Sequence, residues 1–259
     1  PGTGKTTTVR RIVQSFDQAG MKGVIATPTG KAAKRSDEVL STDGVNYSDR
    51  PACLTTFRAL GFNQGKYEFN YHNRLPHDYV ILEESSMESM EDFRNLLYAI
   101  DPAYTRIVIV GDPYQLPSIG AGNILYDLIH SNKVPKIELR KIYRQGANSG
   151  IVFNASRILK GMAPLKEDPL TGEKFTDFFF VPTKDEDESL AKITEWVCEK
   201  LPAKMGFNPT LDIQPLSPGR KSIIGTENLN TTLRARLNPS GRKGFRDFRI
   251  GDKVINKKN

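Results

Sequence analysis

Short apolar runs separated by longer mixed stretches organise the first half of the chain. The apolar runs predict buried strands at residues 24–26, 79–82 and 106–110. The segments around them are bounded by glycine, proline and hydroxyl residues, and they predict helices at residues 6–18, 31–40, 91–100 and 123–130. Because strand and helix alternate in this order, we expect an α/β fold: a parallel sheet with helices on both faces.

The remaining segments extend this pattern less regularly. We expect a short helix at 54–60 and strands at 66–71 and 136–139. In the 66–71 segment, the aromatic residues Tyr67, Phe69 and Tyr71 occupy every second position. A second α/β series follows, with helices at 150–160, 187–201 and 226–237 and strands at 178–181 and 211–216. It predicts two domains, residues 1–145 and an incomplete second domain at 146–259.

Composition narrows the class of protein. The chain has 259 residues, of which 38% are hydrophobic and 26% charged. This is a globular composition, and it excludes a collagen-like, disulfide-scaffold or wholly disordered chain. No apolar run approaches the roughly 20 residues of a membrane helix. Two cysteines, Cys53 and Cys198, lack metal-type spacing, and we expect a reduced, cytoplasmic setting with no membrane partner.

Positive charge collects at the end of the chain. The net charge is +7, and residues 217–259 alone hold 11 Lys or Arg against 3 Asp or Glu. Such a segment suits a polyanion such as nucleic acid, although a solvated surface is the simpler interpretation of charge alone.

The first residues carry the most specific chemistry. Gly4, Lys5 and Thr6 match the end of the phosphate-binding pattern G-x-x-x-x-G-K-[ST], whose first glycine would precede Pro1. We therefore expect the chain to begin inside this motif, without the strand that should lead into it. Lys5 would reach the β- and γ-phosphates, and the Thr6 hydroxyl would bind Mg²⁺. A glycine-rich turn with a chance Lys-Thr pair is the alternative for this motif alone.

Polar residues at the ends of other predicted elements add to this site. Glu83 and Glu84 end an apolar strand, where an acid can hold Mg²⁺ and its neighbour can position water. Gln115 follows the strand that ends in Gly111-Asp112, and Arg144 lies at the expected domain junction. Read separately, these residues are equally compatible with solvated loops, a surface turn and a surface arginine.

One further segment suits a nucleic-acid backbone. Residues 27–35 place hydroxyl groups and backbone N–H groups at a helix start, with basic side chains behind them. A capped amphipathic helix without a ligand fits the same pattern.

Together these segments resemble the RecD-like family of superfamily 1B DNA helicases, relatives of the exodeoxyribonuclease V alpha subunit. The matching pieces run in order along nearly the whole chain: PGTGKT (1–6), TPTGKAAKR (27–35), TTFRALGF (55–62), VILEESSM (80–87), GDPYQLPSIGAGNIL (111–125), LRKIYRQ (139–145), LSPGRKSIIGTENLN (216–230) and FRIGDKVINKKN (248–259). Eight ordered matches are far more specific than any one motif.

The resemblance implies an ATP-driven motor that moves 5′ to 3′ on single-stranded DNA and unwinds duplex in DNA repair, recombination or replication. It implies a RecA-like P-loop NTPase sheet followed by part of a second RecA-like domain, with ATP and Mg²⁺ between them and partner protein subunits possible. A pin hairpin would lie in an insertion at about 64–78. The site residues it implies fall into four groups: nucleotide-binding Pro1, Gly2, Thr3, Gly4, Lys5, Thr6 and Thr7; metal-binding Thr6 and Glu83; catalytic Lys5, Glu84, Gln115 and Arg144; and DNA-binding Thr27, Pro28, Thr29, Gly30, Lys31, Thr55 and Thr56.

Three departures from the family pattern qualify this picture. Glu83 stands where the family usually has Asp, and Phe57 stands where it often has His. The chain ends at Asn259, where an SH3-like insertion would begin. Two other hypotheses therefore stay open: the motor part of a relaxase-helicase fusion, and a DNA-binding ATPase module that has lost catalysis.

Overall fold

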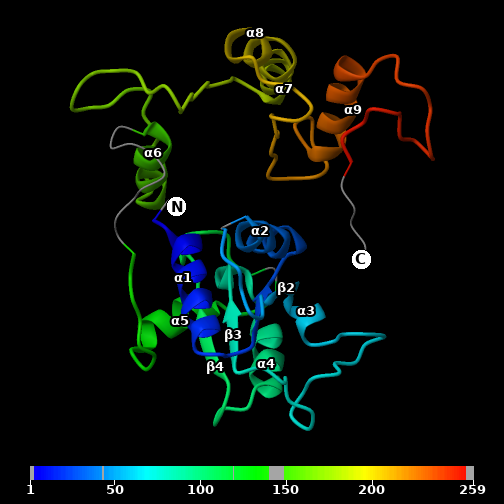
Figure 1. The fold of residues 1–259 in the computed structure, drawn as a ribbon. Helices are drawn as coiled ribbons and strands as arrows, with labels where there is room; N and C mark the ends of the chain where they lie inside the picture. The colour runs from blue at the N-terminus through cyan, green and yellow to red at the C-terminus, as the bar shows by residue number, and fades with distance from the viewer. Residues whose placement is uncertain (1–2, 43, 119, 140–148, 255–259) are drawn as a thin grey trace. The chain divides into compact units, whose positions relative to one another are not determined.

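Four parallel strands form the sheet of the first half of the chain, in the order β2-β1-β3-β4 (Figure 1). The computed structural model describes residues 3–42, 44–118, 120–139 and 149–254. The strands are β1 (Gly23–Thr27), β2 (Ala52–Thr55), β3 (Tyr79–Leu82) and β4 (Arg106–Ile109). In register, Ile25 of β1 lies between Cys53 of β2 and Ile81 of β3, so all four strands end at the same edge.

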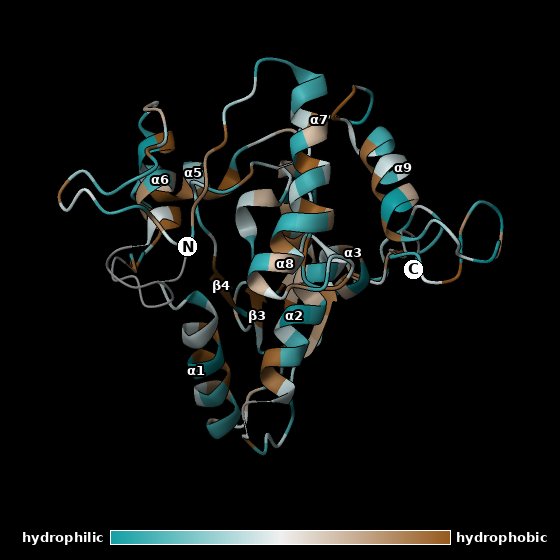
Figure 2. Cartoon of the chain, turned by 90° about the horizontal axis from the view of Figure 1, so that it is seen from above, coloured by the Kyte–Doolittle hydropathy of each residue, from teal (hydrophilic) through white to brown (hydrophobic). Residues whose placement is uncertain are grey.

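Helices cover both faces of this sheet. Their bounds are α1 Lys5–Gln18, α2 Gly30–Ser41, α3 Thr56–Ala59, η1 Ser85–Met87, α4 Met90–Ala99 and α5 Ile124–Ser131. Successive strand residues point to opposite faces. Ile25 and Ile81 therefore pack with Val13 of α1 and Leu40 of α2, whereas Val80 and Leu82 pack with Leu96 and other residues of α3, α4 and α5. Figure 2 shows β3 and β4 in the brown of hydrophobic residues.

The α/β prediction is confirmed, and the main elements lie within one or two residues of the predicted bounds. The helix predicted at 54–60 is wrong at its start, because residues 52–55 form β2 and only Thr56–Ala59 is helical. The local sequence of residues 52–55 does not favour a strand. These residues form one because β1 offers backbone hydrogen-bonding groups along its edge.

The predicted strand at 66–71 is also wrong. Gln64 and Gly65 both have positive φ, 47° and 83°, which makes a tight turn closed by one bridge between Asn63 and Lys66. The cyan segment that follows α3 then projects from the sheet without regular strands (Figure 1). Its aromatic alternation comes instead from Tyr67 and Phe69, which pack against the core at its base.

Contacts divide the chain into two compact units, Pro1–Phe179 and Phe180–Asn259. The boundary predicted near residue 145 lies outside the described residues and stays a prediction. At the end of the first unit, Ser149 caps the start of α6 (Gly150–Leu159) and its hydroxyl donates to Asp177. Asn154 of the same helix makes two hydrogen bonds with the backbone of Leu165.

The second unit is helical in its described part. A continuous run comprises α7 (Glu186–Glu195), the π-helical turn η2 (Trp196–Lys200) and α8 (Leu201–Met205), and α9 spans Thr226–Leu237. The strands predicted at 136–139, 178–181 and 211–216 are wrong, since the structure gives these residues no strand. A short apolar run becomes a strand only where a neighbouring strand pairs with it, and no described neighbour does so here.

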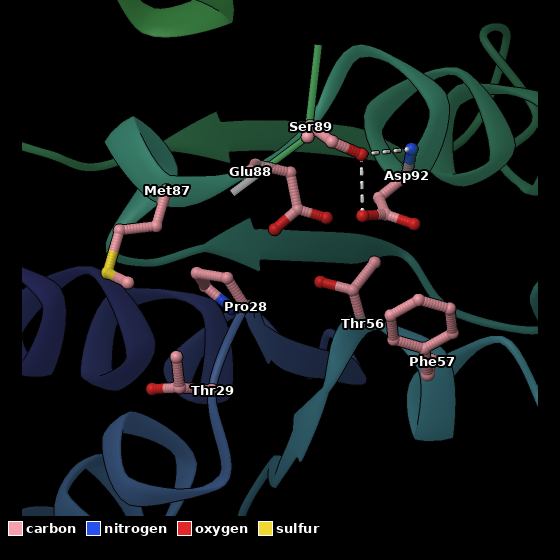
Figure 3. Close-up of a pocket in the computed structure, with 9 residues that line it drawn as sticks. Pro28, Thr29, Thr56, Phe57, Met87, Glu88, Ser89 and Asp92 are labelled. Carbon is pink, nitrogen blue, oxygen red and sulfur yellow. Dashed lines mark hydrogen bonds between the residues drawn. The ribbon is translucent and has the colours of Figure 1, made fainter. Parts of the chain in front are cut away.

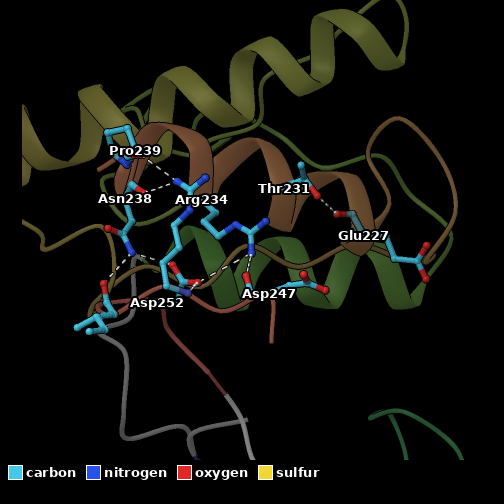
Figure 4. A network of polar contacts seen from close by, with 9 residues as sticks. Glu227, Thr231, Arg234, Asn238, Pro239, Asp247 and Asp252 are labelled. Atoms are coloured by element: carbon cyan, nitrogen blue, oxygen red, sulfur yellow. Dashed lines mark hydrogen bonds and ion pairs between the residues drawn. The ribbon is translucent and has the colours of Figure 1, made fainter. Parts of the chain in front are cut away.

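A polar network holds the segment after α9 (Figure 4). The Asn238 side chain donates to Asp252 Oδ1 at 2.8 Å, and Arg249 donates to the Asn238 carbonyl at 2.8 Å. Arg234 of α9 donates to the Asp247 carbonyl at 2.8 Å. Two cations of the basic segment 217–259, Arg234 and Arg249, therefore hold the segment's own loop.

Candidate nucleotide and DNA site

The start of α1 presents an anion-binding arrangement. Gly4 precedes the helix in the left-handed region, with φ 88°, which glycine adopts at little cost. No side chain caps the helix, so its first-turn N–H groups are left to a ligand or solvent. The Lys5 ammonium lies 3.3 Å from Asp112 Oδ2, which fixes the lysine beside the loop after β4.

Asp112 connects two residues that the sequence predicted separately. Besides Lys5, its carboxylate accepts hydrogen bonds from the Tyr114 amide at 3.1 Å and from Gln115 Nε2 at 3.5 Å. Burial alone would raise the pKa of Asp112, but the Tyr114 amide and Lys5 outweigh it and hold that pKa below its usual value. Lys5 and Gln115 thus meet at one ionised carboxylate, a role that the sequence did not assign to Asp112.

Glycines let the loops after β3 and β4 approach closely. A Cβ on Gly111 would lie 2.5 Å from Ser85 Oγ, and one on Gly122 would lie 2.9 Å from Met90 Cβ. The Ser85 amide and hydroxyl both donate to the Val110 carbonyl, at 3.1 and 3.0 Å. The glycine-rich segment at 111–125 therefore lies directly against the acid-bearing segment at 83–90.

The two predicted acids lie at the end of β3 in different environments. Glu83 is buried, and its carboxyl group accepts a hydrogen bond from Ser36 of α2. Burial raises the pKa of Glu83, since desolvation outweighs the Ser36 hydrogen bond. Glu84 has φ 52°, a left-handed conformation that is strained outside glycine, and its buried Oε2 has no partner among the described residues. Unmet polar atoms and backbone strain of this kind gather at functional sites.

The residues predicted to bind Mg²⁺ are the Thr6 hydroxyl and the Glu83 carboxylate. Within the described residues, no group of three or more His, Cys, Asp or Glu is placed to hold a metal ion. Mg²⁺ is commonly held by one or two carboxylates together with substrate phosphates and water. Thr6 and Glu83 stay predicted ligands of a metal that would take its other ligands from a bound nucleotide and water.

The predicted DNA-contacting segments are neighbours in the sheet. Thr27 at the end of β1 pairs in register with Thr55 at the end of β2. The hydroxyl groups of these segments form hydrogen bonds within the protein. Thr27 donates to the Thr29 carbonyl at 2.9 Å, and the buried Thr56 donates to the Thr27 carbonyl at 3.3 Å. Thr29 and Thr55 accept from backbone amides at the starts of α2 and α3.

Exposure separates the remaining DNA-site predictions. Gly30 and Lys31 are exposed and Pro28 is half-buried. In the segment predicted as a pin, Tyr71 is exposed and the Arg74 guanidinium lies 4.5 Å from its ring centre. Thr3, Thr6 and Thr7 lie at the start of α1, whereas Pro1, Gly2 and Arg144 lie outside the described residues.

Sequence reasoning missed Glu88 altogether. This residue follows η1 and is 1% exposed, and neither carboxyl oxygen has a hydrogen-bond partner among the described residues. Desolvation raises the pKa of Glu88 to about 7, opposed by the nearby Thr56 hydroxyl and assisted by Asp92. No sequence signal marks it, because an acid shortly after a strand is ordinarily solvated.

Comparison with known proteins identifies the family. A family model described as an AAA domain matches residues 1–170. The chain belongs to this AAA domain family. Its relatives place it in the RecD-like branch, as the motifs implied. P-loop members of this family use nucleotides.

Two curated relatives illustrate the match. The ATP-dependent RecD2 DNA helicase of Deinococcus radiodurans is 32% identical over 263 residues, covering 100% of this chain and 33% of the relative. The RecBCD enzyme subunit RecD of Mycolicibacterium smegmatis is 37% identical over 175 residues, covering 61% of this chain and 31% of the relative. The chain thus spans about a third of the length of these relatives.

Solved structures give weaker likenesses. An Arterivirus nonstructural protein 10 helicase with DNA has a TM-score of 0.41 at 19% identity, covering 71% of this chain and 43% of that one. Bacteroides Pif1 bound to single-stranded DNA has a TM-score of 0.40 at 18% identity, covering 75% and 50%. Among the helices described here, none combines the length and apolar character needed to cross a membrane.

Proposed function

We propose that the chain is the motor part of an ATP-dependent DNA helicase. The observation that carries this proposal is the contact between Lys5 and Asp112, which joins the glycine-lysine turn before α1 to the loop after β4. A phosphate group at this edge would meet the first-turn N–H groups of α1 and the Lys5 ammonium together. The RecD-like relatives, named as DNA helicases and RecBCD subunits, support the same function.

In this proposal each site residue has a physical role. Lys5 neutralises charge on the β- and γ-phosphates, and Gln115, already placed beside it through Asp112, contacts the γ-phosphate or the attacking water. Glu84 orients and activates that water. Mg²⁺, held by Thr6 and Glu83 when a nucleotide is bound, supplies further charge neutralisation. Arg144, at the predicted domain junction, would neutralise charge on the transferred phosphate.

DNA would lie across the ends of β1 and β2. Exposed Gly30 and Lys31 at the start of α2 suit the phosphate backbone, which is the part of a strand that carries no sequence information. Thr27 and Thr56 act as positioning residues, because their hydroxyls hold the two segments together. We include 5′ to 3′ movement, a pin near Tyr71, partner subunits like those of the RecD relatives and a cytoplasmic setting in the proposal.

A second candidate, a DNA-binding module without ATP turnover, draws on Glu83. Its carboxyl group is buried against Ser36 and its raised pKa disfavours the charged form that a metal needs. This arrangement would weaken Mg²⁺ binding unless the nucleotide draws Glu83 away from α2.

The test is ATP hydrolysis by the protein with and without single-stranded DNA, combined with unwinding of duplexes that carry either a 5′ or a 3′ tail. We expect DNA to stimulate hydrolysis and only the 5′-tailed duplex to be unwound. DNA binding without ATP hydrolysis would favour the second candidate. Hydrolysis with unwinding from the 3′ tail alone would keep the helicase and overturn its direction.

A further inference from the structure

A pocket of about 160 Å³ lies beside the segments that we propose to contact DNA. Pro28 and Thr56 come from those segments, and Met87 and Glu88 come from the segment after β3. Figure 3 shows the carboxyl group of Glu88 directed into the pocket, between Pro28 and Thr56.

Glu88 is the feature of this pocket that requires explanation. It is 1% exposed and neither oxygen has a hydrogen-bond partner among the described residues, because the Thr56 hydroxyl donates instead to the Thr27 carbonyl. Burying a carboxyl group without partners is costly, and such groups are rare unless a ligand satisfies them. The other acid of the pocket, Asp92, is satisfied, since Ser89 Oγ donates to it at 2.6 Å.

The charges and walls of the pocket restrict what it can hold. Two acids, Glu88 and Asp92, repel a phosphate, so the pocket does not continue the backbone-binding surface at Lys31. The Glu88 carboxylate requires a hydrogen-bond donor. The remaining walls include the ring of Pro28, the thioether of Met87 and the half-exposed ring of Phe57, which suit the faces of a flat ring.

Size narrows the ligand further. A cavity of about 150 Å³ accepts one six-membered aromatic ring, and this pocket has about that volume. Of the pyrimidine bases, cytosine carries an amino group at C4 that can donate a hydrogen bond to Asp or Glu. Thymine carries an oxygen at that position, which cannot donate.

We propose that this pocket binds one base of the single strand, with a preference for cytosine, whose 4-amino group donates to Glu88. The proposal rests on the DNA-binding function proposed above and adds a base-reading site to it. Phosphate contacts at the start of α2 would position the strand, and Glu88 would read one base beside them.

The test compares equilibrium binding of fluorescent (dC)12 and (dT)12 at pH 8, where Glu88 is mostly ionised. We expect about tenfold tighter binding of (dC)12, the effect of one hydrogen bond to a charged group. An oligonucleotide of 2-pyrimidinone, which is cytosine without its 4-amino group, should bind no more tightly than (dT)12. This arm needs no variant and so does not depend on a mutant folding.

Variants then locate the effect. Glu88→Gln and Glu88→Leu should each reduce the preference to less than about twofold while leaving (dT)12 affinity the same or better. The matched control is Glu91→Gln, which removes an acid of the same kind from the exposed first turn of α4, where it pairs with Arg94 at 3.7 Å. It should keep the preference.

Each other outcome overturns the proposal in a distinguishable way. Equal binding of (dC)12 and (dT)12 by a protein that hydrolyses ATP would remove the base site and leave the helicase. A cytosine preference that survives both Glu88 variants would place base reading elsewhere. Thermal stabilisation by K⁺ or Mg²⁺ that Glu88→Gln abolishes, without any base preference, would identify a cation site. Failure to bind either oligonucleotide would overturn the DNA-binding function itself.

Discussion

Asp112 and Glu88 follow neighbouring strands of one sheet and have opposite electrostatic environments. Asp112, after β4, has Lys5, the Tyr114 amide and Gln115 around its carboxylate, and its pKa is lowered. Glu88, after β3 and η1, has no hydrogen-bond partner among the described residues, and burial raises its pKa to about 7. The difference shows that a carboxyl group's partners, more than its position after a strand, decide whether it is ionised and what it can bind.

The largest expected effect concerns the cation beside Asp112. Lys5→Ala should lower ATP turnover at least about thousandfold, because the ammonium that neutralises the developing phosphate charge is lost. Turnover is measured under saturating single-stranded DNA, with circular dichroism to confirm folding. Lys22→Ala, which removes an exposed lysine paired with Asp49 at 3.4 Å before β1, is the control and should keep activity. Normal turnover in folded Lys5→Ala would end the assignment of the nucleotide site.

The second-largest expected effect concerns Glu84, the acid with a strained backbone after β3. Glu84→Gln should lower ATP turnover about hundredfold while ATP still binds, because the carboxylate that activates water is lost. Glu83→Asp should be tolerated, since a carboxylate remains available for Mg²⁺. Nucleotide affinity and turnover are measured on the same preparations. If Glu83→Asp abolishes turnover and Glu84→Gln does not, the roles of the two acids are exchanged.

A smaller effect sharpens the comparison at Glu88. Because its pKa is higher in the folded than in the unfolded protein, Glu88 costs stability as the pH rises from about 4 through about 7. Glu88→Gln should therefore raise the free energy of unfolding by about 1–3 kcal/mol at pH 8 and by little at pH 4. Urea unfolding at both pH values measures this, and Glu91→Gln should change neither. A destabilised Glu88→Gln at pH 8 would contradict the unpaired, ionised carboxylate.

The smallest effect has the opposite pH dependence. The pKa of Asp112 is lowered on folding, so its contribution is present at neutral pH and is lost as the pH falls through the folded pKa. Asp112→Asn should destabilise by about 1 kcal/mol at pH 7, because the contact with Lys5 is partly solvent-screened, and by less near pH 3. The same urea measurements compare the two variants. Parallel pH slopes for Asp112→Asn and Glu88→Gln would break the contrast between the two regions.

Sequence predicted the scaffold of the first unit well. The structure has a strand at the pronounced apolar run Tyr79–Leu82, as predicted. It also has the predicted helix α2, whose start is marked by the capping residue Thr29. Sequence-based prediction failed where strand pairing determines the secondary structure. Ala52–Thr55 forms a strand because it pairs with the edge of β1. Residues 211–216 form none, because no described strand pairs with them. The alternating aromatic residues after Gly65 do not form a strand; Tyr67 and Phe69 alternate because they pack against the core.

The candidate site divides in the same way. The spacing of Gly4, Lys5 and Thr6 and the position of Glu84 and Gln115 after strands were sufficient to predict a nucleotide site, because parallel strands end at one edge. Only the tertiary structure joined Lys5 to Gln115 through Asp112, and only it withdrew the Thr27 and Thr56 hydroxyls into internal hydrogen bonds.

The sequence alone was sufficient to predict the main strands and helices of the first unit, the glycine-lysine turn before α1 and the family, since these depend on residues near one another in the chain. The tertiary structure alone decided the state of each carboxyl group. The pKa of Asp112 is lowered because the Tyr114 amide and a lysine 107 positions away, at 3.3 Å, together outweigh its burial. Burial raises the pKa of Glu88 to about 7, because the segments that surround it give its carboxyl oxygens no hydrogen-bond partner among the described residues. A side chain's charge depends on the groups that folding brings to it, and sequence distance does not encode them.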